Sequence, residues 1–145
     1  METHSISHSP EETAQFGATL AQNLQPGLLT LSGELGVGKT KLTAGILSAL
    51  GAEGPYQSPT FMLVKEYHLP ETTATGIARV YHADAYRLEP KDFETLGFQA
   101  WFDDTEGLVI LEWPERIAKL LSESRIDIKI TQLSESERKI SLEYL

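Results

Sequence analysis

The sequence predicts an α/β protein in which a mixed β-sheet lies between two layers of helices, as a compact three-layer domain spanning residues 1–145. Short apolar segments alternate with segments of helical periodicity, which favours a sheet covered by helices. The final segment, residues 126–144, alternates apolar and polar residues, as an antiparallel C-terminal hairpin does. Because 41% of the 145 residues are hydrophobic, the chain can bury a substantial core.

The first half of the chain has the clearest element boundaries. Ser9 is followed by a proline and two acidic residues, which is typical of a helix start, and this helix is expected to run to about Leu24. Residues 28–33 are a short apolar run after a Pro-Gly pair and predict a buried strand. Residues 39–51 have apolar side chains at helical spacing and end in Gly51, which suits a helix C-terminus.

The second half adds short strands and helices. We expect strands over residues 61–67, 78–86 and 107–113, and short helices over residues 89–104 and 114–121. The first two strands are separated by a polar, hairpin-like connection. In the last segment, residues 126–130 and 140–144 alternate around a polar turn, so one face of this hairpin should be buried. The sheet is therefore expected to be parallel near its centre and antiparallel at an edge.

The loop between the first strand and the second helix carries the strongest functional signal. It reads GELGVGKT, residues 33–40, and fits the pattern G-x-x-x-x-G-K-[ST] in the strand–loop–helix context that this motif requires. Its glycines let successive N–H groups point at phosphate oxygens, and the helix N-terminus adds positive partial charge. Lys39 would neutralise the β- and γ-phosphates of a nucleotide, and the Thr40 hydroxyl would hold Mg²⁺. The fold expected is therefore that of a P-loop NTPase.

A second apolar strand ends in a candidate metal-binding acid. Residues 108–112 are four apolar residues followed by Glu112. In P-loop NTPases a second buried strand delivers a carboxylate towards Mg²⁺. Ligands of such sheets lie beyond the carboxyl ends of the strands, where both Glu112 and the glycine-rich loop are expected. Glu112 is therefore a candidate metal ligand.

Another strand end, HADAYRL at residues 82–88, is rich in polar side chains. His82, Asp84 and Tyr86 are expected to share one strand face, because side chains alternate with a period of two. His82 and Asp84 could bind a metal together, but two ligands are a weak metal signal. We expect Asp84 instead to hold the Mg²⁺ shell or to orient water near the γ-phosphate.

A third short motif, SPTF at residues 58–61, leads from a loop into a strand. Its proline biases Ser58 towards an extended conformation. Thr60 could serve as a switch threonine that senses the γ-phosphate or its metal. By contrast, His4, His8 and His68 form no constellation with one another and are expected at the surface.

Composition excludes several functions. The net charge of −9 and the scattered arginines argue against direct binding of a nucleic acid backbone, which needs clustered Lys and Arg. No apolar run reaches the length of a membrane span, and no signal peptide is visible. The chain has no cysteine, which excludes disulfides and thiolate zinc sites. A cytoplasmic protein without a membrane partner is expected, with any link to RNA passing through another protein.

Four motifs occur together in a fixed order: GELGVGKT, SPTF, H-x-D-x-Y-R-L and the E-W-P-E that begins at Glu112. In this combination the sequence resembles the bacterial TsaE family, also called YjeE, over nearly its full length. That family is a compact P-loop ATPase of tRNA threonylcarbamoyladenosine (t6A) synthesis. The resemblance implies slow ATP hydrolysis with Mg²⁺, and joint action with TsaD and TsaB, which attach the threonylcarbamoyl group to an adenosine of tRNA.

The resemblance also implies roles for individual residues. The implied ATP-binding residues are Glu34, Leu35, Gly36, Val37, Gly38, Lys39, Thr40 and Lys41, with Thr13 on the first helix as a further candidate. Thr40 and Glu112 would be metal ligands. The implied catalytic residues are Lys39, Thr60, Asp84 and Glu112. One departure is visible: the family often has a second Thr or Ser where this chain has Lys41, so altered nucleotide affinity is expected rather than lost function.

Two other functions share this fold. A small-molecule P-loop kinase would close an arginine-bearing lid over its substrate, and the sequence has neither a long insertion nor an arginine cluster to form one. A nucleotide-dependent binding module without useful hydrolysis is the second alternative. Phosphate release measured with and without partner proteins distinguishes it from an ATPase.

Overall fold

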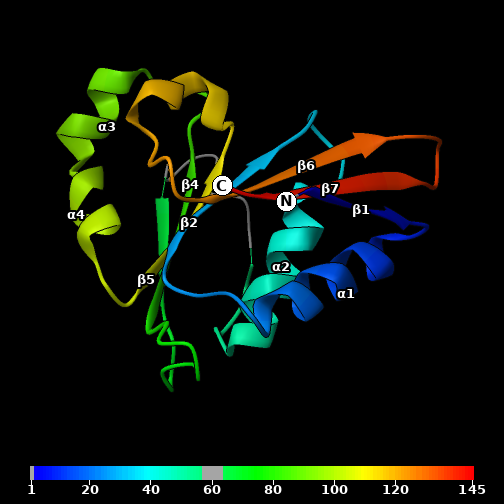
Figure 1. The fold of residues 1–145 in the computed structure, drawn as a ribbon, viewed down its shortest axis with the longest axis horizontal. Coiled ribbons are helices and arrows are strands. Elements are labelled where there is room, and N and C mark those ends of the chain that lie inside the picture. Colours follow the sequence, from blue (N-terminus) through cyan, green and yellow to red (C-terminus); the bar gives the residue numbers. More distant parts are fainter. Residues whose placement is uncertain (1, 57–63) are drawn as a thin grey trace.

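The computed structural model describes residues 2–56 and 64–145, which form a seven-stranded mixed sheet with helices on both faces (Figure 1). The elements in chain order are β1 (Glu2–Ser7), α1 (Pro10–Ala21), β2 (Gly27–Ser32), α2 (Lys39–Leu50), β3 (Val64–His68), β4 (Arg79–Asp84), α3 (Pro90–Leu96), α4 (Phe98–Asp103), β5 (Gly107–Glu112), the 3₁₀ helix η1 (Pro114–Leu120), β6 (Ile126–Gln132) and β7 (Arg138–Tyr144). The strand order is β1-β7-β6-β2-β5-β4-β3. The central strands β6, β2, β5 and β4 are parallel, and both edges are antiparallel.

The sheet separates two apolar cores. Helices α1 and α2 cover one face, and α3, α4 and η1 lie on the other (Figure 1). Successive side chains of the buried strand β5 enter opposite cores: Leu108 and Ile110 pack with α1 and α2, whereas Val109 and Leu111 pack with Phe93 of α3 and its neighbours. Burial on both faces explains why this strand is a continuous apolar run. The predicted three-layer α/β fold is confirmed.

The third layer covers only part of the sheet. In the β6–β7 hairpin, apolar side chains such as Ile128 and Ile140 face α1 and α2, as the alternating sequence predicts. The opposite face of this hairpin carries polar side chains and forms the floor of an open hollow. The molecule is therefore three layers thick over β2, β5 and β4, and two layers thick over the hairpin.

Several boundaries differ from the sequence prediction. The first helix starts as predicted, with Ser9 Oγ accepting from the Glu12 N–H at 3.1 Å. It ends at Ala21, because the next amides donate to carbonyls three residues back, and this tighter winding continues to Leu24. The strand expected over 78–86 ends at Asp84, whose side chain accepts the Tyr86 N–H at 2.9 Å and turns the chain.

Strand β1 was not predicted. Its sequence, ETHSIS, is short and mostly polar, and it is a strand because it pairs antiparallel with β7 along its whole length. The β3–β4 pair confirms the expected hairpin in the middle of the chain, although residues 61–63 of the expected first strand lie outside the described residues. Within the described ranges, no helix has both the length and the apolar character needed to cross a membrane.

Candidate functional site

The glycine-rich loop joins the carboxyl end of β2 to the N-terminus of α2. Gly36 and Gly38 have φ of 75° and 122°, values that side chains with a Cβ rarely adopt. Gly33 is also required by space, since a Cβ there would lie 2.7 Å from the Ile130 carbonyl oxygen. The buried side chain of Val37 anchors the loop in the core. The loop is thus held open by its glycines and fixed by one apolar contact.

Lys39, the first residue of α2, turns back across this loop. Its side chain is buried, and Nζ donates to the Gly33 carbonyl at 2.7 Å. Nζ also lies 3.9 Å from the ring centroid of Trp113. Burial lowers the pKa of the Lys39 amine, whereas the negative charges of Glu112 and Asp84 act in the opposite direction. The amine is therefore a desolvated cation held next to two acids.

Those two acids end adjacent strands. Asp84 is the last residue of β4, Glu112 is the last residue of β5, and the two are register partners. Both side chains are buried. Burial raises the pKa of the Asp84 carboxyl, and the neighbouring charge of Glu112 adds to that effect, while a hydrogen bond from the Tyr86 N–H opposes it. Two desolvated carboxylates side by side favour a cation between them and the loop.

The acids and the loop line one cleft of about 490 Å³. Lys39, Thr40, Asp84 and Glu112, which the sequence singled out, meet here. The remaining lining residues are Leu35, Gly36, Gly38, Lys41, Tyr86, Arg87 and Trp113. Tyr86 lies beyond the end of β4, so the prediction that it shares the strand face of His82 and Asp84 is wrong. It nevertheless faces the cleft, with its ring 4.9 Å from that of Trp113.

Trp113 sits in an unusual conformation directly after Glu112. Its φ of 58° and ψ of 49° place a bulky residue in the left-handed region, which costs backbone strain. The Trp113 N–H donates to the Leu31 carbonyl at 3.3 Å, and the ring covers Lys39. The strained residue thus lies beside the cleft, and its indole ring forms part of the cleft wall.

A second cleft of about 390 Å³ begins on the other side of the loop. It shares Gly36, Gly38 and Lys41 with the first and is also lined by His8, Ser9, Pro10, Thr13, Val37, Glu135, Ser136 and Arg138. Thr13 therefore borders the loop. Its hydroxyl, however, is buried against Ser7 Oγ at 2.7 Å, so only its methyl group approaches Gly38.

The β6–β7 connection at this second cleft was missed by sequence reasoning. Arg138 Nε donates to the Val37 carbonyl at 2.9 Å, which ties the C-terminal hairpin to the glycine-rich loop. Glu135 and Ser136 complete the wall. No local motif marks these residues, because they reach the loop only through the pairing of β6 with β2. Thr60 lies outside the described residues, and its switch role stays a prediction.

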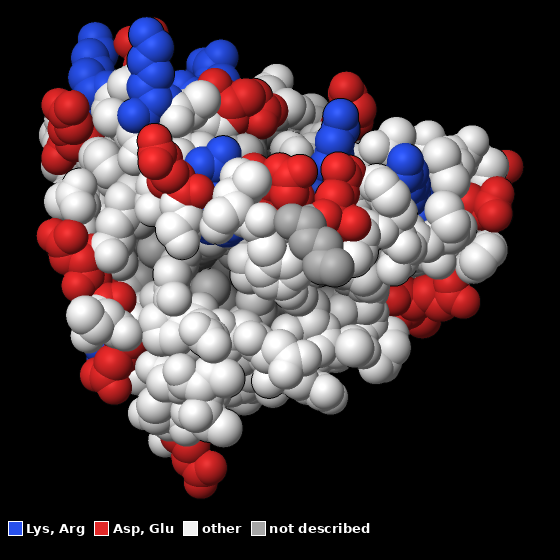
Figure 2. Space-filling view, in the orientation of Figure 1, with Lys and Arg blue, Asp and Glu red and all other residues white. Residues whose placement is uncertain are grey.

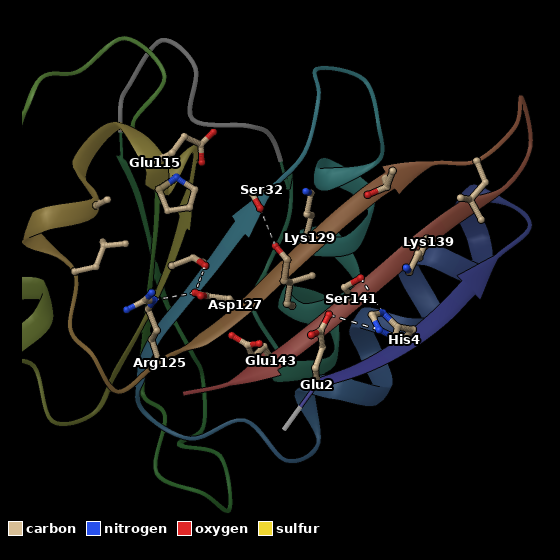
Figure 3. Close-up of a pocket in the computed structure, with 17 residues that line it drawn as sticks. Glu2, His4, Ser32, Glu115, Arg125, Asp127, Lys129, Lys139, Ser141 and Glu143 are labelled. Carbon is tan, nitrogen blue, oxygen red and sulfur yellow. Dashed lines mark hydrogen bonds and ion pairs between the residues drawn. The ribbon is translucent and has the colours of Figure 1, made fainter.

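A hollow larger than either cleft, of about 710 Å³, lies elsewhere. It is the open face of the β6–β7 hairpin, bordered by η1 (Figure 3). Polar contacts link side chains in its lining: Asp127 accepts from Arg125, and His4 contacts Ser141 and Glu2 (Figure 3). It contains neither a residue of the glycine-rich loop nor the paired acids, so its size does not make it the reactive site.

The donor set of the first cleft suits Mg²⁺. This ion takes oxygen ligands, and it commonly binds through one or two carboxylates together with substrate phosphates rather than in an all-protein cage. Thr40, Asp84 and Glu112 supply a hydroxyl and two carboxylates beside a phosphate-binding loop. Among the described residues no cluster of three or more His, Cys, Asp or Glu could hold a metal by itself. A Mg²⁺ that arrives with a nucleotide fits these residues.

Comparison with known proteins agrees with this geometry. A family model described as "Threonylcarbamoyl adenosine biosynthesis protein TsaE" matches residues 7–140. A Bacillus subtilis (strain 168) protein named tRNA threonylcarbamoyladenosine biosynthesis protein TsaE is 37% identical over 134 residues, which cover 92% of this chain and 80% of the relative. A Treponema pallidum (strain Nichols) protein of the same name is 34% identical over 139 residues, covering 94% and 97%.

The fold also matches a solved structure. The crystal structure of YdiB from Bacillus subtilis superposes with a TM-score of 0.74 at 28% sequence identity, covering 98% of this chain and 84% of that one. The family match includes the glycine-rich loop, both strand-end acids and the hairpin that meets the loop. This chain belongs to the TsaE family.

Proposed function

We propose that this protein is the ATP-binding, Mg²⁺-dependent and slowly hydrolysing component of tRNA t6A synthesis, acting as one ATPase domain over residues 1–145. The observation that carries the proposal is the placement of Lys39 and the glycine-rich loop directly opposite the paired strand-end acids Asp84 and Glu112. Family membership supports nucleotide binding and a role in this tRNA modification.

The two clefts divide the nucleotide between them in this proposal. Backbone N–H groups of the loop and the N-terminus of α2 would bind the phosphates. Lys39 would exchange the Gly33 carbonyl for the β- and γ-phosphate oxygens, since a charged acceptor forms the stronger hydrogen bond. The second cleft, on the far side of Gly38 and Lys41, would take the adenosine part, with Thr13 and Arg138 in its walls.

The acids would act on the metal and on water. Thr40 and Glu112 would hold Mg²⁺, which when bound neutralises charge on the β- and γ-phosphates. Asp84, at the end of the neighbouring strand, would position a water molecule near the γ-phosphate. Trp113 and Tyr86 would restrict access of bulk water from their side of the cleft. The enclosure strengthens each charge interaction, because the local dielectric constant falls.

The partners proposed are TsaD and TsaB, with tRNA reached only through that complex. On the face shown in Figure 2, acidic side chains lie along the upper part and the outer edges, and Lys and Arg lie mainly along the upper rim, where acids interrupt them. With a net charge of −9, this surface would repel a phosphate backbone but could complement a basic protein surface. We also propose that Thr60 senses the γ-phosphate. The proposed location is the cytoplasm, where the complex would act on tRNA.

The first test concerns the loop lysine. Lys39→Ala should weaken ATP–Mg²⁺ binding about tenfold to a hundredfold, because it removes a charge-assisted contact to the phosphates worth roughly 1.5–3 kcal/mol. Isothermal titration calorimetry on the folded variant measures this loss. Lys91→Ala is the matched control, since Lys91 is an exposed lysine of α3 that lines neither cleft. Wild-type affinity in Lys39→Ala would contradict the assignment of the loop.

The second test addresses the partners. Purified TsaD, TsaB and tRNA, supplied with an activated threonylcarbamoyl donor, should form the modified nucleoside only when this chain and ATP are added. The isolated chain should give no tRNA gel shift at physiological salt, because nonspecific binding needs clustered cations. Pull-downs with an ATP analogue, ADP and no nucleotide should differ. Equal partner binding in all three states, without hydrolysis, would favour a binding module, and phosphate transfer to a small molecule would favour a kinase.

A further inference from the structure

His82 makes a buried contact to which the proposed function assigns no role. It lies on β4 opposite Ile110 of β5, so Glu112, two residues farther along β5, is on the same sheet face. His82 Nε2 and Glu112 Oε2 are 2.6 Å apart. The two side chains are only 1% and 4% exposed, so this is a buried contact shielded from water. The ring therefore reaches one oxygen of the candidate metal ligand.

The direction of this hydrogen bond follows from the chemistry of the two groups. An ionised carboxylate only accepts, so the proton between the two atoms belongs to His82 Nε2. The other ring nitrogen, Nδ1, is buried and has no hydrogen-bond partner among the described residues. His82 is thus held as a donor to Glu112 on one side and left unsatisfied on the other.

The His82 ring borders a narrow void beneath α2 that is too small to hold a water molecule. The void is lined by Thr40, Thr43, Ala44, Leu47, Tyr56 and His82. Thr43 Oγ1 is also buried there without a partner. A leucine would fill this position without leaving a polar atom unpaired, so packing does not explain the imidazole. The hydrogen bond to Glu112 does.

We propose that His82 is a positioning residue that holds Oε2 of Glu112 and leaves Oε1 to bind Mg²⁺. This inference rests on the proposed function, since it gives Glu112 the role of a metal ligand. A hydrogen bond to one carboxylate oxygen fixes the rotation of the group, and partners of this kind commonly change metal affinity tenfold to a hundredfold. His82 acts through Glu112 and touches neither the nucleotide nor the metal.

The test separates metal binding from nucleotide binding. ATP affinity is measured calorimetrically with Mg²⁺ and with EDTA, for wild type, His82→Leu and His82→Gln. His82→Leu should bind ATP in EDTA as wild type does but lose about tenfold of the affinity gained with Mg²⁺. His82→Gln should retain most of that gain, because its amide N–H₂ reaches the position of the ring Nε2. A merely structural role would lower both affinities together.

A second pair of variants keeps the test decisive if His82→Leu fails to fold. His82→Asn has the amide of glutamine on a shorter side chain, so its donor cannot reach Glu112, and it should lose the Mg²⁺-dependent gain that His82→Gln keeps. Thr43→Val removes the other unsatisfied group at the same void and should leave the gain unchanged. Equal values for Asn and Gln, or a loss in Thr43→Val as large as in the His82 variants, would overturn the proposal.

Single-turnover hydrolysis gives an independent readout. In His82→Asn the Mg²⁺ concentration for half-maximal rate should rise about tenfold, and the rate should recover at saturating Mg²⁺. A wild-type midpoint in this variant overturns the role of His82 alone. If wild type itself gains no ATP affinity from Mg²⁺, both this inference and the proposed metal site fail.

Discussion

A carboxylate lies at each end of strand β4, and the two differ in how their charge is compensated. At the start, Arg79 donates from Nε and Nη2 to both oxygens of Asp104 at 2.7 and 2.8 Å, and the Tyr81 hydroxyl donates to the same group at 2.7 Å. The hydrogen bonds from Arg79 hold the pKa of Asp104 well below its usual range. At the other end, burial and the charge of Glu112 raise the pKa of Asp84.

The contrast separates an acid whose charge is compensated within the chain from the acids to which the proposed function assigns a ligand. Asp104 gains enough donors to remain ionised, so its charge is compensated within the chain. Asp84 and Glu112 are buried next to each other, and the nearby cation, Lys39, is also bound to a backbone carbonyl. Asp84 is therefore under-compensated, which is typical of functional sites, where a ligand supplies the missing charge.

The largest expected effect is a loss of ATP hydrolysis on substitution of Glu112, at the end of β5. Glu112→Gln should lower single-turnover hydrolysis at saturating ATP about a hundredfold or more, because it removes a group that stabilises charge in the transition state. ATP binding in EDTA should hardly change. Asp84→Asn should also reduce hydrolysis more than binding.

The matched control is Glu94→Gln, since Glu94 is an exposed acid on α3 that lines neither cleft. Its hydrolysis rate should equal that of wild type. If Glu112→Gln hydrolyses at the wild-type rate, β5 is not the strand that carries the metal.

At the start of β4, where Arg79 contacts Asp104, a substitution is expected to reduce stability. Asp104→Asn should lower the free energy of unfolding by about 2 kcal/mol at pH 7, since it weakens hydrogen bonds between charged groups. Hydrolysis per folded molecule should stay unchanged. Urea denaturation measures the first quantity, and phosphate release the second. A fall in activity without a fall in stability would remove the distinction between the two ends.

This loss should depend on pH. The folded pKa of Asp104 lies below its unfolded value, so its contribution is complete above pH of about 4 and disappears as pH falls towards the folded pKa. The difference in stability between wild type and Asp104→Asn should therefore shrink on acidification below pH of about 4. Urea curves at several pH values would show this, and a constant difference would contradict it.

The smallest expected effect is a gain in stability. Asp84→Asn should raise the free energy of unfolding by about 1 kcal/mol at pH 7, as neutralising an under-compensated acid at a functional site commonly does. The folded pKa of Asp84 is raised, so ionisation destabilises the fold progressively as pH rises through the unfolded and then the folded pKa. The gain should thus be absent near pH 3 and should increase as pH rises towards 7. A destabilised Asp84→Asn at pH 7 would show that Asp84 supports the fold.

Features that depend on neighbouring residues could be predicted from local sequence patterns. The cap at Ser9, the loop around Gly36 and Gly38, and the alternation of the last hairpin are local hydrogen-bonding, conformational and periodic patterns, which a short stretch of chain fixes. The placement of Glu112 at a strand end follows in the same way. These features were sufficient to predict an α/β P-loop fold and most residues that line the first cleft.

The contacts between segments far apart in the sequence depend on the packing of the whole chain. Strand β1 exists because β7 offers an edge, and Arg138 reaches the loop because β6 pairs with β2. Likewise, the contact of His82 with Glu112 joins residues 30 positions apart and depends on the β4–β5 register. Strand order and register minimise the free energy of the whole sheet and its two cores, so no local window of sequence contains them.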